Sequence, residues 1–296
     1  MSVLLLIKGV DEANHEQLTV LERKELTAQQ VHAALRMEGE EELGRGSQAL
    51  FWSAVSCGLT LGLSLIAQGV LHHALPDASW RPLLASLGYS LGFIVLILAR
   101  QELYTSNTLT AVLPVLDSWR AEMVPNLLRV SVVVLAGNLV GAFAFASAAA
   151  STSAFSPALR ETFASIGVQH AGYGIWPTFV KGIFGGWMIA LMTWVMPGAH
   201  HARIWVIALV TWCLSAAEMT HVIAGSVDVL FAVLSGQVAA TAYIARFLVP
   251  TFVGNTLGGM VLVAVLNHAQ VVAGSSSKPN TTSRARWNPG PRVHRR

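Results

Sequence analysis

Six apolar segments, each long enough to cross a lipid bilayer as a helix, dominate the sequence. Crossing ~30 Å of hydrocarbon takes about 20 mostly apolar residues, and the segments cover approximately residues 49–71, 82–116, 127–150, 177–196, 203–234 and 243–268. Charged residues make up 12% of the chain, against about 25% in soluble domains. We therefore predict an all-α membrane protein with an N-terminal segment (1–48), a six-span domain (49–272) and a tail (273–296).

The second and fifth segments are too long for one simple helix, and each has polar residues near its middle. The second contains Gln101-Glu102, and the fifth contains Glu218, Thr220 and His221. A charged or titratable group at membrane depth costs ~2.5–3.5 kcal/mol on insertion scales. Broken helices are tolerated there where they are buried in protein or line a water-filled cavity. The sequence therefore predicts a pore between two broken helices.

The two halves of the six-span domain resemble each other. Gly137–Ala142 matches Gly254–Gly259 at an offset of 117 residues, and Gln101–Thr105 matches Ala217–His221 at an offset of 116. Three spans per half is an odd number, so the halves (about 49–150 and 177–268) would insert with opposite orientations. Inverted repeats of this kind place the functional site near the midplane. We expect Thr105 and His221 to face each other there.

Two asparagines occupy corresponding positions in the matching glycine-rich motifs, Asn138 in the third span and Asn255 in the sixth. A broken helix leaves backbone groups without partners inside the membrane, where an unpaired polar group is costly. We therefore expect each asparagine to hydrogen-bond the backbone at the neighbouring break.

Lysine and arginine placement predicts the orientation, because cytoplasmic loops carry an excess of both residues. With the N-terminus inside, the four inside segments hold five, two, one and six of them. Both termini are thus expected to be cytoplasmic. Thr27 to Gln30 predicts a capped helix before the first span, which is either an ordinary solvated helix or a lid on the membrane face of the pore.

The tail is expected to be disordered, and its six basic residues could contact anionic membrane lipid. The formal net charge of +3 is small, and the basic residues lie mostly in the tails, so we expect no nucleic-acid partner. Cys57 and Cys213 fall in apolar runs and predict neither a disulfide framework nor a metal or redox motif. No cofactor or metal is expected.

Five motifs in order between residues 37 and 268 resemble the formate/nitrite transporter family, above all its branch of unassigned substrate. They are Met37–Leu43, Glu102–Asn107, Gly137–Ala142, Thr220-His221 and Gly254–Gly259. The resemblance implies an aquaporin-like six-helix protomer, assembled as a homopentamer in a bacterial inner membrane, with one pore per protomer. It also implies passage of small monovalent anions of weak acids, such as formate, nitrite, lactate or hydrosulfide, with protons as a possible partner.

In the pattern of that family His221 is the central pore histidine, and Thr105 lies in the loop that breaks the second span. The resemblance assigns Leu103 and Tyr104 to the cytoplasmic constriction, and spacing places Phe93 and Leu214 at the opposite one. Histidine exchanges a proton near physiological pH. We therefore expect His221 either to pass a proton to the anion, which then crosses as the neutral acid, or to balance its charge transiently.

The remaining titratable groups at membrane depth are Glu102, Glu218, Asp228 and Lys181. We expect the three carboxylates to cap backbone amides at the breaks, and a proton relay is the alternative. Lys181 either attracts anions at the outer mouth, snorkels to the membrane interface or forms an ion pair. Arg100 could pair with one of the carboxylates.

Other functions remain open. A channel for another small solute would share the architecture, although no Asn-Pro-Ala triplet of a water channel occurs, and a non-transporting membrane scaffold is a further alternative. An intramembrane enzyme would need a catalytic set. We recognise neither an HExxH set nor a nucleophile elbow, so no enzymatic activity is expected.

Overall fold

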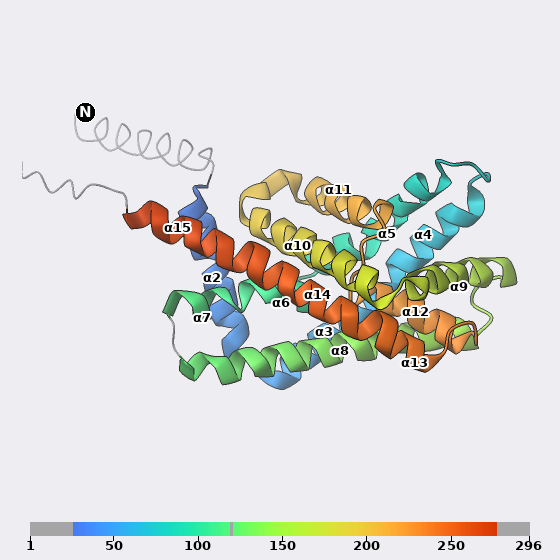
Figure 1. The fold of residues 1–296 in the computed structure, drawn as a ribbon, viewed down its shortest axis with the longest axis horizontal. Coiled ribbons are helices and arrows are strands. Elements are labelled where there is room, and N and C mark those ends of the chain that lie inside the picture. Colours follow the sequence, from blue (N-terminus) through green and yellow to red (C-terminus); the bar gives the residue numbers. More distant parts are fainter. Residues whose placement is uncertain (1–25, 119–120, 277–296) are drawn as a thin grey trace, which may run out of the picture.

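The computed structural model describes residues 26–118 and 121–276, and these ranges contain helices and no strands (Figure 1). The α-helices are α2 (Ala28–Gly44), α3 (Ser47–Thr60), α4 (Gly62–Ala74), α5 (Arg81–Leu98), α6 (Tyr104–Thr110), α7 (Leu113–Ser118), α8 (Val124–Ser151), α9 (Pro157–Gly172), α10 (Ile175–Ala199), α11 (Arg203–Ala216), α12 (Ala224–Leu234), α13 (Ala240–Ala242), α14 (Val249–Gly259) and α15 (Leu266–Ser276). Two π-helical segments, η3 (Tyr243–Leu248) and η4 (Met260–Val265), flank α14.

Five helical stretches of the described chain are long and apolar enough to cross a membrane, and α12 is a shorter apolar helix. The stretches are Ser47–Ala74, Arg81–Leu98, Val124–Ser151, Ile175–Ala216 and Ala240–Ala273. The fourth is 42 residues long but contains two helices. The chain turns at His200, where φ is 33°, so that α10 and α11 pack side by side (Figure 1).

Both expected interruptions are present. α5 ends at Leu98 and α6 begins at Tyr104, while α11 ends at Ala216 and α12 begins at Ala224. Each break contains one residue in the left-handed region, Arg100 (φ 52°) and Glu218 (φ 55°). That conformation costs ~1–3 kcal/mol for a residue with a side chain, so tertiary contacts must hold both breaks in place.

Two helix pairs support the breaks, α3 with α8 and α10 with α14. A Cβ added to Gly58 would lie 2.1 Å from the carbonyl oxygen of Asn138, and one added to Gly186 would lie 2.2 Å from that of Asn255. Small residues allow helix backbones to approach this closely. Glycine is therefore required at these two crossings, which bring the asparagines up to the breaks.

The N-terminal helix begins as expected. The Thr27 hydroxyl accepts from the Gln30 backbone N–H (3.3 Å), and the Gln30 side chain accepts from the Thr27 N–H (2.8 Å), which together form a capping box. Val31 and Leu35 are buried in a cluster with residues of α6, α7 and α10. The helix is therefore packed against the body of the protein.

The sequence analysis assigned no element to residues 151–176, where the structure has α9. Ser156 caps this helix by accepting from the Leu159 N–H (3.3 Å), and Pro157 occupies its first turn, where a missing N–H costs nothing. Buried Phe163 packs edge-on against Phe231 of α12 (centroids 5.5 Å apart). At the other end, α15 continues to Ser276, three residues past the expected start of the tail. The expected disorder of the tail concerns residues that lie mostly outside the described chain.

Candidate functional site

The two helix breaks meet at one hydrogen bond. The Thr105 hydroxyl lies 2.9 Å from Nε2 of His221, and both residues are buried, at 0% and 1% exposure. Thr105 belongs to the first turn of α6, and His221 lies in the break before α12. The sequence predicted that these residues face each other, and this contact is present.

The other ring nitrogen of His221 fixes the tautomer. Nδ1 accepts hydrogen bonds from the backbone N–H groups of Ile223 (3.3 Å) and Ala224 (3.1 Å) at the start of α12. A nitrogen that accepts carries no proton, so we assign the proton to Nε2, which donates to Thr105. The positive end of the α12 dipole also disfavours an imidazolium here. The geometry thus favours a neutral imidazole whose N–H points at Thr105.

Asn138 holds the first break together. Its side-chain oxygen accepts from the Tyr104 N–H (3.0 Å), and its Nδ2 donates to the carbonyls of Glu102 (2.8 Å) and Ala54 (2.9 Å). A single buried amide therefore satisfies one group within the break, one at the start of α6 and one on α3.

Asn255 holds the second break in the same way. It accepts from the Val222 N–H (2.9 Å) and donates to the carbonyls of Thr220 (3.0 Å) and Gly182 (2.7 Å). The hydrogen bonds expected for the two asparagines are thus present. The same three hydrogen bonds recur at both breaks. The additional carbonyl belongs to α3 at the first break and to α10 at the second.

Phe93 is the apolar side chain that stands against His221, with the two rings edge to face and their centroids 5.2 Å apart. Leu214, the other residue placed by spacing, is fully buried, and its carbonyl accepts from the Met219 N–H (2.9 Å).

Leu103 and Tyr104 point to different surroundings. Leu103 lines a cavity that reaches the first break. The Tyr104 hydroxyl instead lies 2.8 Å from that of Thr256, and its ring lies beside that of Phe252 on α14 (centroids 5.5 Å). Thr220, next to the histidine, turns its hydroxyl to the Thr178 carbonyl (3.0 Å).

Glu102 is buried beside the first break and pairs with Arg45, while Asn107 donates to its other oxygen (3.1 Å). We expected Glu102 to cap backbone amides. This expectation was wrong, because Asn138 already satisfies the backbone and the carboxylate pairs with a cation. Arg100 was a candidate partner for one of the carboxylates, but Arg45 supplies the cation at Glu102. Arg45 precedes the first span by two residues, and no local pattern links it to Glu102.

Glu218, at the second break, also pairs with a cation rather than capping an amide. Lys181 Nζ lies 3.3 Å from its carboxylate and 3.1 Å from its carbonyl oxygen. Tyr173 (2.8 Å) and Gln169 (3.1 Å) donate to the same carboxylate. Of the interpretations of Lys181, the ion pair is present. The sequence analysis missed Tyr173 and Gln169 as partners of the Glu218 carboxylate.

Asp228 of α12 lies 3.2 Å from Nδ1 of His170 on α9, and the aspartate is buried. It too faces a side chain and not a freed amide, so the expected cap was wrong here as well. The pairing depends on α9, a helix that the sequence analysis did not predict.

A cavity of about 590 Å³ opens between α2 and the first break. Its charged lining consists of four carboxylates and three guanidinium groups, from Glu38, Glu41, Glu42, Glu102, Arg45, Arg100 and Arg203. Glu42 receives the hydroxyl of Thr110 on α6 (2.8 Å), and burial raises the pKa of this carboxyl well above its ordinary value. The N-terminal helix thus forms one wall of the approach to Leu103.

One sequence pattern needs correction. Gly88-Tyr89-Ser90-Leu91-Gly92 has GxSxG spacing, although we recognised no nucleophile elbow. These residues lie inside α5, and the Ser90 hydroxyl donates to the Ala208 carbonyl (2.9 Å). An elbow requires a strand-to-helix turn with an exposed hydroxyl, so this serine packs two helices together.

Comparison with known proteins shows the family. The family described as "Formate/nitrite transporter" matches residues 29–269. The chain is 38% identical over 257 residues to "Inner membrane protein YfdC" of Escherichia coli (strain K12), covering 87% of this chain and 83% of that protein. It is 26% identical over 195 residues to "Uncharacterized transporter YrhG" of Bacillus subtilis (strain 168), covering 63% and 72%.

Solved structures show the same fold. A "Pentameric formate channel with formate bound" aligns with a TM-score of 0.64 at 23% identity, covering 76% of this chain and 98% of that one. An "FNT family ion channel" aligns with a TM-score of 0.70 at 18% identity, covering 84% and 99%. The chain therefore belongs to the formate/nitrite transporter family.

Proposed function

We propose that this protein is a membrane channel for small monovalent anions of weak acids, and that the anion passes between Thr105 and His221. The observation that carries the proposal is the buried 2.9 Å contact between these side chains, where two broken helices meet. Membership of the transporter family and the formate bound in a structural relative support the same class of solute.

The two side chains can act as hydrogen-bond donors to an anion. The Nε2–H of His221 and the Thr105 O–H lie together in an otherwise dry site, and an anion entering it loses hydration that must be replaced. Hydrogen bonds to a charged acceptor contribute ~1.5–3 kcal/mol each. The arriving anion would take the place of Thr105 as acceptor for Nε2–H.

The tautomer of His221 helps to distinguish the two mechanisms that the sequence leaves open, proton transfer to the anion and transient balance of its charge. Protonating Nδ1 would break its bonds with two backbone N–H groups, and giving up the Nε2 proton would leave an imidazolate. Both changes are costly in a buried site. We therefore favour charge stabilisation by a neutral donor, with any proton that crosses carried by the anion as its neutral acid.

We further propose six spans in two inverted repeats, with both termini on the cytoplasmic side of a bacterial inner membrane. α5–α6 and α11–α12 are the broken spans in this arrangement. The recurring asparagine contacts support the repeat, and the inner-membrane relative supports the location. A homopentamer follows the pentameric structural relative. Exposed apolar side chains such as Trp52, Trp176 and Trp205 would face lipid or neighbouring protomers.

Flux through proteoliposomes tests the proposal. Stopped-flow measurements with formate, nitrite, acetate and ammonium should show selective passage of the weak-acid anions through the wild-type protein. His221→Ala should reduce this flux, whereas His201→Ala, at an exposed histidine between α10 and α11, should not. Unchanged flux and pH dependence in His221→Ala would show that the assignment of the histidine is wrong.

The same panel separates the alternatives. Flux of ammonium without flux of the anions would indicate a channel for another small solute. A folded protein that passes none of the four solutes would indicate a non-transporting scaffold.

A further inference from the structure

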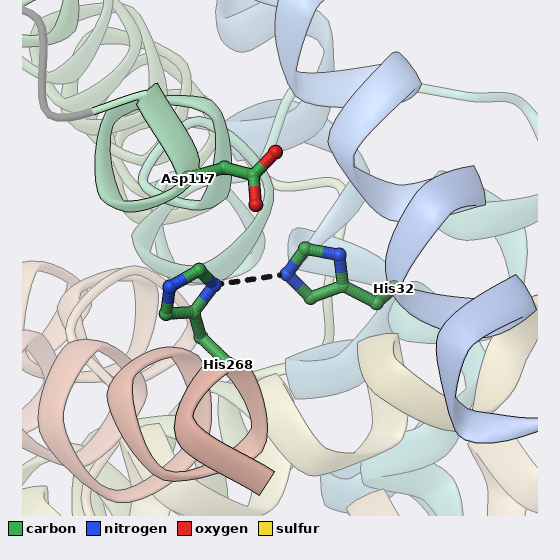
Figure 2. Close-up of side chains that lie close together, drawn as sticks. All are labelled: His32, Asp117 and His268. Carbon is green, nitrogen blue, oxygen red and sulfur yellow. Dashed lines mark hydrogen bonds between the residues drawn. The ribbon is translucent and has the colours of Figure 1, made fainter. Parts of the chain in front are cut away.

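Three ligand-type side chains gather on helices that are far apart in the sequence. His32 lies on α2, Asp117 on α7 and His268 on α15, and one potential ligand atom from each comes within 4.8 Å of the others. Figure 2 shows the two imidazole rings edge to edge, joined by a hydrogen bond between Nε2 of His32 and Nδ1 of His268, with the Asp117 carboxylate beside this bond. This cluster is separate from the His221 site.

The spacing of the nitrogens suits a metal ion. Nε2 of His32 and Nδ1 of His268 are 3.2 Å apart. Two ligands bound at ~2.0–2.1 Å in tetrahedral geometry lie about 3.3 Å from each other. An ion bound by both nitrogens would replace the hydrogen bond between them, with each ring tilting to aim its lone pair at the ion, and the Asp117 carboxylate would supply the third protein ligand.

The surroundings of the cluster hold its members in place. Arg36, one turn beyond His32, donates to Oδ2 of Asp117 (2.6 Å), which leaves the second carboxylate oxygen for an ion. Trp194 packs edge-on against the His32 ring (centroids 6.3 Å). Such outer contacts orient metal ligands in known sites.

We propose that His32, Asp117 and His268 bind a divalent transition-metal ion of the zinc class, which fastens α2 to α7 and α15. Two imidazoles and one carboxylate, with a fourth position left for water, form a ligand set typical of Zn²⁺. Because α2 also lines the 590 Å³ cavity, the ion holds one wall of that cavity in place. A metal ion at this position would limit the movement of α2 relative to α7 and α15.

Metal titration of the full-length protein tests the proposal, using protein purified without a histidine tag and treated with EDTA. Equilibrium dialysis should find about one Zn²⁺ per chain, and Co²⁺ should give the visible absorption bands of a tetrahedral site. His268→Gln and Asp117→Asn should each weaken binding at least about tenfold. His201→Gln is the matched control and should bind like the wild type.

Amide hydrogen exchange provides a second measurement. Zn²⁺ should slow exchange across α2 in the wild type and in His201→Gln, but not in His268→Gln. His268→Gln could fail to bind Zn²⁺ because it misfolds. Asp117→Asn changes an exposed residue on another helix and therefore provides a second, independent test of binding. Less than half an ion per chain, or equal binding by His268→Gln and His201→Gln, would overturn the proposal. Neither outcome depends on anion flux.

Discussion

The two helix breaks share a backbone solution and differ in their chemistry. At each break one buried asparagine accepts one N–H and donates to two carbonyls, and each break contains one left-handed residue. The side chain that follows differs, because the first break presents the hydroxyl of Thr105 and the second the imidazole of His221. The comparison indicates that satisfaction of the backbone groups is the shared requirement, and our proposed function depends on one side chain at each break.

The carboxylates beside the breaks differ as well. Glu102 is 8% exposed and pairs with Arg45 under α2, whereas Glu218 is 49% exposed beside Lys181. The same pattern of acid and cation therefore lies in two dielectric surroundings. We expect the removal of one partner to cost more stability at the buried pair than at the exposed pair.

Replacing the asparagines should give the largest effect. Asn138→Leu and Asn255→Leu each leave one N–H and one carbonyl at the break buried without partners, at ~1–3 kcal/mol per group. The carbonyls of Ala54 and Gly182 lie within helices and keep their helix hydrogen bonds. Both variants should lose several kcal/mol of stability, which would lower the thermal unfolding midpoint in detergent by similar amounts. Ser165→Ala, at an exposed hydroxyl on α9, is the control. A large shift in only one asparagine variant would show that the breaks are not equivalent.

Replacing the two side chains that meet should separate their roles. His221→Ala should reduce anion flux in proteoliposomes at least about tenfold, or ~1.4 kcal/mol. Thr105→Ala should reduce it less, about threefold, because the Nε2–H donor remains. The double variant should show non-additive losses if the side chains act on the same anion. Additive losses, or a larger effect at Thr105, would contradict the assigned roles.

Removing the carboxylates should distinguish the buried break from the exposed one. Glu102→Ala leaves Arg45 and Asn107 without their partner and should cost ~1–3 kcal/mol. Glu218→Ala should cost less than ~1 kcal/mol, since exposed ion pairs contribute little. Chemical denaturation in detergent, with Glu161→Ala as an exposed control, measures both. Equal losses would show that exposure does not separate the pairs.

The smallest expected effect concerns α2, which covers the first break and not the second. Burial raises the pKa of Glu42, so docking of α2 is strongest at pH values below the unfolded pKa of about 4.5. It weakens as the pH rises through the higher pKa of the docked state. Amide exchange in α2, corrected for intrinsic pH dependence, should rise with pH in the wild type. Glu42→Gln should reduce this dependence, leaving the smaller part from Glu38, whose pKa burial also raises. An unchanged dependence would contradict the role of Glu42.

Much of the membrane-spanning domain was predictable from the sequence. Hydropathy marks the apolar helices, and the mid-span position of His221 marks its break, because a titratable group is rare at that depth. The glycine-rich motifs also placed Asn138 and Asn255 next to the breaks. These signals are local in the sequence or recur at a fixed offset.

The remaining contacts had no such signal. The partners in the Arg45–Glu102 and His32–His268 contacts are 57 and 236 residues apart. Such pairs depend on how helices pack, and α9, which brings His170 to Asp228, lies outside both predicted repeats. Hydropathy says which helices cross a bilayer but not which charged side chains meet between them.

The small volume of the cavity beneath α2 sets the local concentration that a single solute molecule has inside it. One small molecule inside about 590 Å³ corresponds to a local concentration of about 3 M. At millimolar bulk concentrations the cavity therefore holds either no solute or one molecule. The bulk concentration sets the fraction of time for which the cavity is occupied. A solute in it meets the charges of Glu42, Arg45 and Glu102 one molecule at a time.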